Sequence, residues 1–515
     1  MTTKSLVGIF LTLAIVLTAC APLKPTSIRT PEPDYWPTAG WLSSTPEAQG
    51  MDSKLLAQML EEISANNTRI HSFLIVRNGY MVTEAYFHPY TRATKMHVQS
   101  ITKSVIGALA GIAIEDGYIK SENQNLLSFF PNQEFANPGK NKEGIRLKHL
   151  LSMSSAFPCQ EFSDSGQRME QTSSWVQFML DLPVNNPPGK TFGYCDGNPH
   201  LLSAIVEQVT GMTTREFANQ ELFKPLGIPV VEETDWETDP EGFSNGGYGL
   251  YLKPVDLAKF AFLYLQNGKW EGQQILPERW VADSTVQYVQ KPEGPGYGYL
   301  WTVYPQSDYP DHYAALGRAG QQIHIYPSKN LIVVVTAELE TFVEAPEIEH
   351  VLNEFVLPAI QSDSALAKNP EGVSRLRAAV ELARNPVQPV AKLPAIADEI
   401  SGKLYTLEEN PNGWKTLVVF FEPGANTARV STNEFNDLDE IGLDNIYRRA
   451  MLPQDQYMMR GHWVNDDTFL IEWIALPLGN NSSNNIQLKY SGEEVEISVA
   501  PPIFAGEPTV IKGSR

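Results

Sequence analysis

Ser100 and Lys103 are the residues in this chain whose types and spacing most directly suggest chemistry. Apolar residues recur at helical spacing from Val98 to Ile112, which predicts the start of a buried helix. Residues three apart share one helix face, so the serine hydroxyl would lie next to the lysine amine. A serine becomes a nucleophile when a neighbour takes its proton, and a buried, neutral lysine can do this. The alternative is an ordinary helix start with Ser100 as the N-capping residue.

A second group of polar residues follows a Pro-Pro-Gly-Lys turn at 187–190. Tyr194 and Asp196 come next, and another apolar helix begins a few residues later. Together with Ser100 and Lys103, this order resembles the class C β-lactamase and penicillin-binding-protein-like superfamily of serine hydrolases. The resemblance implies that Tyr194 and Lys103 form a proton shuttle; the alternative for Tyr194 is a strand aromatic that packs on the core. Asp196 stands where the family usually has Asn, and an ionised Asp accepts hydrogen bonds but donates none.

The third family motif is degenerate in this chain. The family has Lys-Thr-Gly or His-x-Gly on the strand beside the nucleophile, and Ala315, Leu316 and Gly317 fill that position here. The glycine is expected to keep the strand edge open for substrate. The resemblance also implies an oxyanion hole made by the backbone N–H groups of Ser100 and Arg318. Ala315 lacks the family's basic side chain, which weakens carboxylate recognition, and Arg318 either supplies that charge or is solvated.

The resemblance extends from about Trp41 to Leu357, with the motifs in the family's order. It implies an α+β domain over residues 41–362: an antiparallel sheet flanked by helices, with a helical subdomain that holds the Tyr194 loop. It implies a serine hydrolase that cleaves an ester or amide of a small molecule or peptide through an acyl-enzyme on Ser100, without a cofactor. Two alternatives remain. One is a β-lactamase or D-alanyl peptidase acting on cell wall, and the other is a non-catalytic, lipid-anchored binding or sensor protein.

Two other sequence matches lack the flanking elements or the order along the chain that their motifs require. Residues 242–246 match G-x-S-x-G around Ser244, but an acidic loop precedes them where a nucleophile elbow needs an apolar strand. Residues 349–353 match the general-base box of class A β-lactamases, but they follow the third motif instead of preceding it. The nine histidines are scattered without paired ligand spacing, so no metal site is predicted.

The N-terminus resembles that of a bacterial lipoprotein. One positive charge precedes an apolar run from Leu6 to Leu17, which is too short to span a bilayer because a spanning helix needs about 20 residues. The Leu-Thr-Ala-Cys that follows resembles a lipobox, so residues 1–19 are a predicted signal peptide, and Cys20 a lipid-modified membrane anchor outside the cytoplasm. Frequent prolines over 20–40 indicate an extended tether. The alternative is a plain secretory peptide with an incidental cysteine.

Two of the three cysteines remain once Cys20 is assigned to the lipid anchor. In an oxidising compartment, the even remainder suggests a disulfide between Cys159 and Cys195. Both lie beside segments that carry family motifs, and in the family these loops converge near the nucleophile. A bridge there would brace the site, and two buried free thiols are the alternative.

The 515 residues carry a net charge of −21, with 42% hydrophobic and 19% charged residues. Such a composition is typical of a globular chain, and the acidity argues against nucleic acid or anionic membrane surfaces as partners. A helix and a proline-rich linker are predicted over 363–395. Short strand-like runs separated by turns follow over 396–515, which predicts a small all-β barrel or sandwich domain without catalytic groups.

The lipobox makes a direct prediction for Cys20→Ala. The variant cannot accept the lipid, so it should move from the membrane fraction to the soluble extracytoplasmic fraction, which fractionation and immunoblotting would measure. Wild-type protein that is soluble and carries no lipid by intact-mass analysis would contradict the lipoprotein hypothesis.

Overall fold

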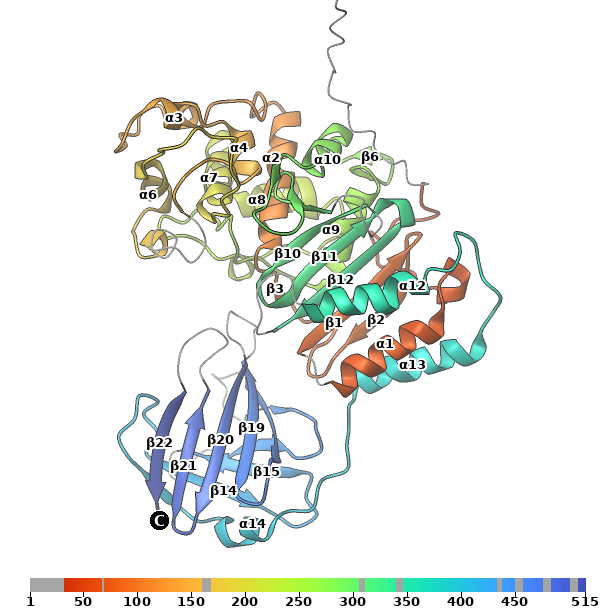
Figure 1. The fold of residues 1–515 in the computed structure, drawn as a ribbon, viewed down its shortest axis with the longest axis vertical. Helices are drawn as coiled ribbons and strands as arrows, with labels where there is room; N and C mark the ends of the chain where they lie inside the picture. Colours follow the sequence, from red (N-terminus) through yellow and green to blue (C-terminus); the bar gives the residue numbers. More distant parts are fainter. Residues whose placement is uncertain are drawn as a thin grey trace, which may run out of the picture.

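In the computed structural model, the described residues are 32–66, 69–159, 168–304, 311–339, 346–432, 438–449, 457–475, 483–500 and 508–515. Cys20, the predicted signal peptide and much of the predicted tether lie outside them. Figure 1 shows two parts: an α+β domain above and a β-domain below. Every helix within these ranges is too short or too polar to span a bilayer.

The first domain is built on one antiparallel sheet whose strand order is β2-β1-β12-β11-β10-β9-β8-β7. These strands are β1 (Ile70–Arg77), β2 (Tyr80–Tyr86), β7 (Val289–Gln290), β8 (Gly296–Tyr297), β9 (Thr302–Tyr304), β10 (His312–Gly317), β11 (Gln321–Tyr326) and β12 (Leu331–Ala337). The central strands β1 and β12 are buried along their whole length, because helices cover both faces of the sheet. The left-handed Asn330 (φ 46°) closes the turn between β11 and β12.

One face of the sheet carries a small core with the helices α1 (Ser53–Ala65), α11 (Pro346–Val351), α12 (Leu357–Ala359) and α13 (Pro370–Arg384). The Asp52 side chain caps α1 by accepting from the Lys54 N–H, which satisfies one of the free donors at a helix start. α13 packs against α1 and contributes Leu376 and Ala379 to this core. The helix predicted within 363–395 therefore starts at Pro370 and belongs to the first domain, and the linker begins only after it.

The other face carries the larger core, with α2 (Ile101–Glu115) and α9 (Pro254–Leu265) beside the sheet and α10 (Glu278–Ser284) next to them. A helical subdomain extends from this face. Its helices are α3 (Lys140–Glu143), α4 (Leu147–Leu151), α6 (Trp175–Asp181), α7 (Gly197–Thr210) and α8 (Thr214–Ala218). Short connecting elements are η1 (Pro46–Gln49), η2 (Leu126–Phe129), η3 (Asn219–Phe223), η4 (Glu233–Asp235), η5 (Arg318–Gly320), η6 (Pro327–Lys329), η7 (Leu352–Val356), β3 (Met96–His97), β4 (Tyr251–Leu252), β5 (Lys269–Trp270) and β6 (Gln273–Gln274).

The C-terminal domain begins with α14 (Ala395–Ile400) and is a barrel of nine strands, closed where Gly442 of β16 pairs with Arg460 of β18. Closure leaves no free sheet edge along the ring. The strands are β13 (Tyr405–Leu407), β14 (Thr416–Phe421), β15 (Thr427–Ser431), β16 (Asp439–Gly442), β18 (Tyr457–Trp463), β19 (Thr468–Ala475), β20 (Ser483–Ser491), β21 (Glu494–Val499) and β22 (Thr509–Ser514), with β17 (Arg448–Arg449) paired to the side of β18. The predicted barrel-or-sandwich is therefore a barrel.

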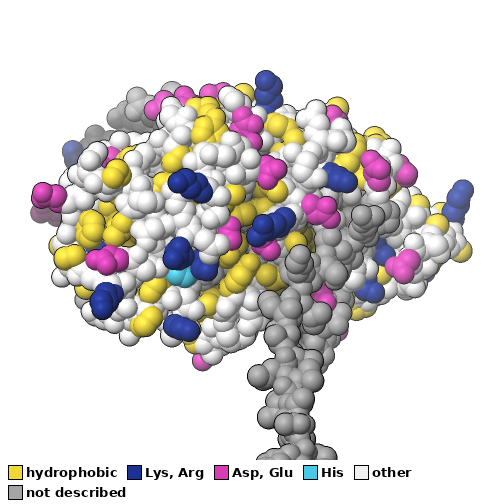
Figure 2. All heavy atoms as spheres, turned by 90° about the horizontal axis from the view of Figure 1, so that it is seen from above, with side chains coloured by type: hydrophobic (Ala, Val, Ile, Leu, Met, Phe, Trp, Pro, Cys, Tyr) yellow, Lys and Arg dark blue, Asp and Glu magenta, His cyan; other side chains and the backbone are white. Residues whose placement is uncertain are grey.

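The barrel docks on the first domain through a small mixed cluster. Tyr90 and Met96 of the first domain pack with Tyr447 and Ile474 of the barrel. The Tyr447 N–H donates to His88 Nε2 at 3.1 Å, which adds a hydrogen bond across the junction. The opposite side of the first domain, seen in Figure 2, shows acidic and basic side chains interspersed among apolar ones, with no field of a single sign.

Tight packing of α2 makes a prediction for Gly111→Ala. A Cβ at this position would lie 2.5 Å from Cδ1 of Trp280 in α10. Overpacking costs about 1–3 kcal/mol, and this exceeds the gain of up to about 1 kcal/mol in helix propensity. The urea midpoint of the first domain should therefore fall. Gly139→Ala, which has open space around it, is the matched control, and equal midpoints for the two variants would refute this packing.

Candidate active site

Ser100 stands immediately before α2, at the N-cap position, and its side chain makes no capping hydrogen bond. Its Oγ instead accepts a hydrogen bond from Lys103 Nζ at 2.7 Å. Gln99, the preceding residue, has a left-handed backbone (φ 52°), which is uncommon for a non-glycine residue and often marks functional sites. The alternative of a plain N-capping serine therefore does not describe this hydroxyl.

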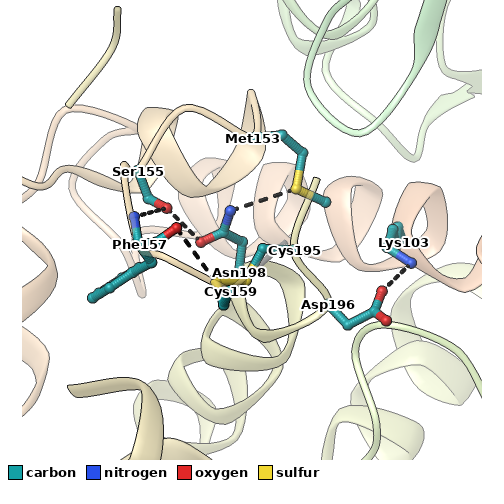
Figure 3. The surroundings of a disulfide bond; sticks show 8 residues. All are labelled: Lys103, Met153, Ser155, Phe157, Cys159, Cys195, Asp196 and Asn198. Atoms are coloured by element: carbon teal, nitrogen blue, oxygen red, sulfur yellow. Dashed lines mark hydrogen bonds and ion pairs between the residues drawn. A yellow bond between two sulfur atoms is a disulfide. The ribbon is translucent and has the colours of Figure 1, made fainter. Parts of the chain in front are cut away.

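Lys103 is almost completely buried, with 1% of its side chain exposed. Besides Ser100, its Nζ donates to the Gly247 carbonyl at 2.7 Å and lies 2.6 Å from Oδ1 of Asp196. Figure 3 shows the Lys103 and Asp196 side chains pointing toward each other. A buried amine is costly unless it is partnered; Nζ donates hydrogen bonds to the Ser100 hydroxyl and the Gly247 carbonyl, and it forms an ion pair, without an aligned hydrogen bond, with Asp196. The lysine is consequently held in one orientation beside the serine.

Tyr194 and Asp196 reach this site from the start of α7, where Asp196 is the N-cap residue. The Tyr194 ring lies next to the lysine, with Nζ 4.7 Å from the ring centroid. The structure thus brings Ser100 and Lys103 together with Tyr194 and Asp196. More than ninety positions separate these two pairs in the sequence. Asp196 differs from an asparagine at this position, because its carboxylate forms an ion pair with Lys103, with Oδ1 2.6 Å from Nζ.

A disulfide joins Cys195, between Tyr194 and Asp196, to Cys159, with the Cα atoms 5.3 Å apart (Figure 3). Next to it, Ser155 Oγ donates to Asn198 Oδ1 at 2.8 Å, so a polar contact reinforces the covalent one. Closing a loop of 36 residues removes freedom mainly from the unfolded chain and stabilises by roughly 4 kcal/mol in the chain-entropy model. The segment that carries Tyr194 is therefore held to residues 155–159 by two contacts.

The third motif lies on β10, the strand that ends at Gly317. A Cβ on Gly317 would come within 2.9 Å of the Val98 carbonyl oxygen and 3.0 Å of Gln99 Cβ. Glycine is therefore required for β10 to pass this close to the segment that precedes Ser100. Arg318 follows and is only partly exposed, and Ala315 is buried within the larger core. The predicted oxyanion role of the Arg318 N–H remains a prediction.

Several residues around the site carry no motif. Tyr297 packs against Phe192 and Tyr194, with ring centroids 5.3 and 6.3 Å apart, and makes an aromatic wall beside Tyr194. Tyr248 donates to Glu170 at 2.6 Å; burial, followed by this hydrogen bond, raises the Tyr248 pKa. Only the proximity of Phe192 to Tyr194 in sequence could have suggested this wall.

Ser244, the serine of the G-x-S-x-G match, is not part of this group of residues. Ser244 is 2% exposed, in a loop between η4 and β4. Its N–H donates to Glu207 Oε1 at 3.0 Å, and its carbonyl accepts from Ser203 Oγ at 2.7 Å. Neither the strand nor the helix of a nucleophile elbow flanks it. Within the described ranges, no group of three or more His, Cys, Asp or Glu residues is placed to hold a metal ion.

A family model described as Beta-lactamase matches residues 56–353, more than half of the chain. The chain belongs to the beta-lactamase family. This confirms the predicted family and fold, and it confirms a serine hydrolase at that general level. The matched residues run from within α1 to within η7, so they include every motif of the site described above.

Individual relatives are distant. An uncharacterized protein of Alkalihalophilus pseudofirmus is 24% identical over 305 residues, which cover 51% of this chain and 82% of that protein. A 6-aminohexanoate-dimer hydrolase of Paenarthrobacter ureafaciens is 25% identical over 241 residues, or 44% of this chain and 58% of its own length. The solved structure of EstCE1, a hydrolase with promiscuous acyltransferase activity, has a TM-score of 0.51 at 17% identity, covering 60% of this chain and 99% of that one.

The ion pair at Lys103 makes a prediction for Asp196→Asn. An asparagine can donate a hydrogen bond to the side-chain amide carbonyl of a penicillin, whereas an ionised aspartate repels that oxygen. Labelling by a fluorescent penicillin should rise about tenfold, the size of one hydrogen bond, with a smaller change in ester hydrolysis. Asp398→Asn, on the exposed face of α14, removes the same charge as a control. Equal penicillin labelling of both variants would contradict a substrate-reading role for this position.

Proposed function

We propose that this protein hydrolyses ester or amide bonds through an acyl-enzyme on Ser100, with Lys103 and Tyr194 as the proton shuttle. The observation that carries the proposal is the 2.7 Å contact between Lys103 Nζ and Ser100 Oγ, made by a buried amine. A buried, fixed amine within hydrogen-bond distance meets the geometric requirement for a base that activates a serine. Tyr194 lies beside the same amine and can pass the proton onward.

In the first half of the reaction, Ser100 Oγ attacks the substrate carbonyl, and its proton passes to the Lys103–Tyr194 pair. Asp196, 2.6 Å from the amine, stabilises the ammonium that forms on Lys103. The N–H groups of Ser100 and Arg318 are proposed to hold the oxyanion, a type of contact that contributes strongly to acyl transfer. The proton then goes to the leaving alcohol or amine as the carbonyl re-forms.

In the second half, water attacks the acyl-enzyme and gives its proton to the same pair of residues. The acid product leaves with its carboxyl group, and Ser100 regains its hydrogen. Each proposed step uses only a side chain or backbone group of this chain, so the proposed chemistry requires no cofactor.

The substrate class that fits these residues best is a small ester or amide lacking the carboxylate of a β-lactam. Ala315 removes the basic side chain that would bind such a carboxylate, and Asp196 adds a negative charge instead. The similarity to a 6-aminohexanoate-dimer hydrolase and to a hydrolase with promiscuous acyltransferase activity supports this class. The intact Ser100–Lys103 contact counts against a purely non-catalytic binding or sensor protein.

The site of action is a separate proposal. The lipobox at Cys20 supports an extracytoplasmic enzyme held at a membrane by its lipid. The disulfide beside the site supports the same compartment, since disulfides persist in oxidising surroundings.

The nucleophile assignment predicts the behaviour of four variants with p-nitrophenyl esters. Ser100→Ala and Lys103→Ala should each lose roughly a thousandfold or more in kcat, as catalytic-triad knockouts do. The double variant should be little worse, because residues that act as one unit are not additive. Tyr194→Phe should lose less, since Lys103 can still take the proton.

Ser244→Ala is the matched control, because its serine matches a motif but is buried in a loop. It should keep near wild-type kcat and still form an acyl-enzyme, seen as a mass increase after exposure to the ester panel. Loss of acylation in Ser244→Ala together with its retention in Ser100→Ala would overturn the mechanism.

A further inference from the structure

A cavity of about 400 Å³ lies between the two domains, away from Ser100. His71 and Tyr90 line it from the first domain, and Tyr447, Arg460 and Glu472 line it from the barrel. Its volume falls within the range of small-molecule sites, and domain interfaces are where such sites often occur. No residue of the proposed catalytic group is part of its wall.

His71 and Tyr90 form a stacked pair in this wall, and one nitrogen of the pair lacks a protein partner. Both side chains are 6% exposed, and their ring centroids lie 3.8 Å apart. Among the described residues, His71 Nδ1 is buried without a hydrogen-bond partner. Burial lowers the His71 pKa to about 3, so its ring is neutral and can both donate and accept. Buried polar groups are nearly always bonded, and this unpartnered nitrogen therefore favours a bound molecule in the cavity.

The charges around them favour a ligand with charges of both signs. The wall contains two guanidinium groups, from Arg69 and Arg460, and two carboxylates, from Glu338 and Glu472. Arg460 lies 2.7 Å from Glu472, and its guanidinium is 4.7 Å from the centroid of the Tyr447 ring. The wall carries equal numbers of positive and negative side chains. A ligand with a net charge would therefore leave an excess charge in this cavity, whereas a zwitterion adds none.

Apolar groups complete the wall, among them Phe87, Trp473 and Ile474. We propose that the interdomain cavity is a second ligand site, which binds a small zwitterion with an apolar side chain, such as an amino acid or short peptide, through Tyr90 and His71. Carboxylate-bearing ligands pair well with guanidinium groups, and aromatic rings accept aliphatic side chains. The site is independent of the acyl-enzyme chemistry.

An occupant would touch residues that also join the domains. Tyr90 belongs to the cluster formed with Met96, Tyr447 and Ile474. Met96 is in β3, four positions before Ser100. A molecule bound against Tyr90 therefore stabilises both the docking of the barrel and the segment that leads to the nucleophile.

Calorimetric titration of full-length Ser100→Ala, which cannot turn over, is the test. L-leucine or L-leucyl-L-leucine should bind saturably below 10 mM. Isoamylamine and 4-methylpentanoate keep the side chain but only one charge, and they should bind at least tenfold more weakly than leucine. Absence of saturable binding by either zwitterion, or equal affinity for the singly charged analogues, overturns the proposal.

Tyr90→Phe, introduced into the same background, locates the site. The change removes only the hydroxyl and keeps the buried ring, so the melting temperature should change little, while affinity for the zwitterion falls about three- to tenfold. Tyr118→Phe, at an exposed position, should bind like the parent. Wild-type protein blocked at Ser100 by a fluorophosphonate should also bind normally. Unchanged affinity in Tyr90→Phe, or loss of binding on fluorophosphonate treatment, would show that the ligand sits elsewhere.

Discussion

The need to partner one buried amine organises this protein. Lys103 is removed from water, and three oxygens surround its nitrogen: the Ser100 hydroxyl and the Gly247 carbonyl accept hydrogen bonds from it, and the Asp196 carboxylate forms an ion pair with it. They come from the start of α2, from a glycine-rich turn before β4 and from the cap of α7. Losing either hydrogen-bond acceptor would leave a donor unsatisfied at a cost in free energy. The start of α2, the glycine-rich turn and the start of α7 must therefore meet at this nitrogen.

Local spacing explains which parts of the site the sequence could predict. Ser100 and Lys103 are one helical turn apart, so a correct helix prediction is enough to bring them together. Tyr194 is predictable as a site residue because its position after the proline–glycine turn resembles a family motif. The role of Asp196 was less accessible. The sequence indicated a weakened substitute for asparagine, whereas the structure shows an ion pair with Lys103 that depends on a long-range approach of α7 to α2.

Other features of the structure cannot be predicted from a single sequence. The Gly247 contact uses a backbone carbonyl, which every residue possesses, and Tyr297 lies in no motif. α13 looks like a polar linker helix because only one narrow face is apolar, and its packing on α1 becomes visible only in three dimensions. In the barrel, closure between Gly442 and Arg460 distinguishes it from a sandwich, and strand patterns alone do not encode that choice.

Because the Cys159–Cys195 disulfide forms only under oxidising conditions, the redox conditions around the protein affect the geometry of the site. Its second half-cystine, Cys195, lies between Tyr194 and Asp196, which both approach Lys103. A chain made in a reducing environment would keep these side chains yet lack the covalent link between the two loops that carry Cys159 and Cys195. Oxidation is then a maturation step, and the redox potential of the compartment sets how completely the newly made protein acquires its finished geometry.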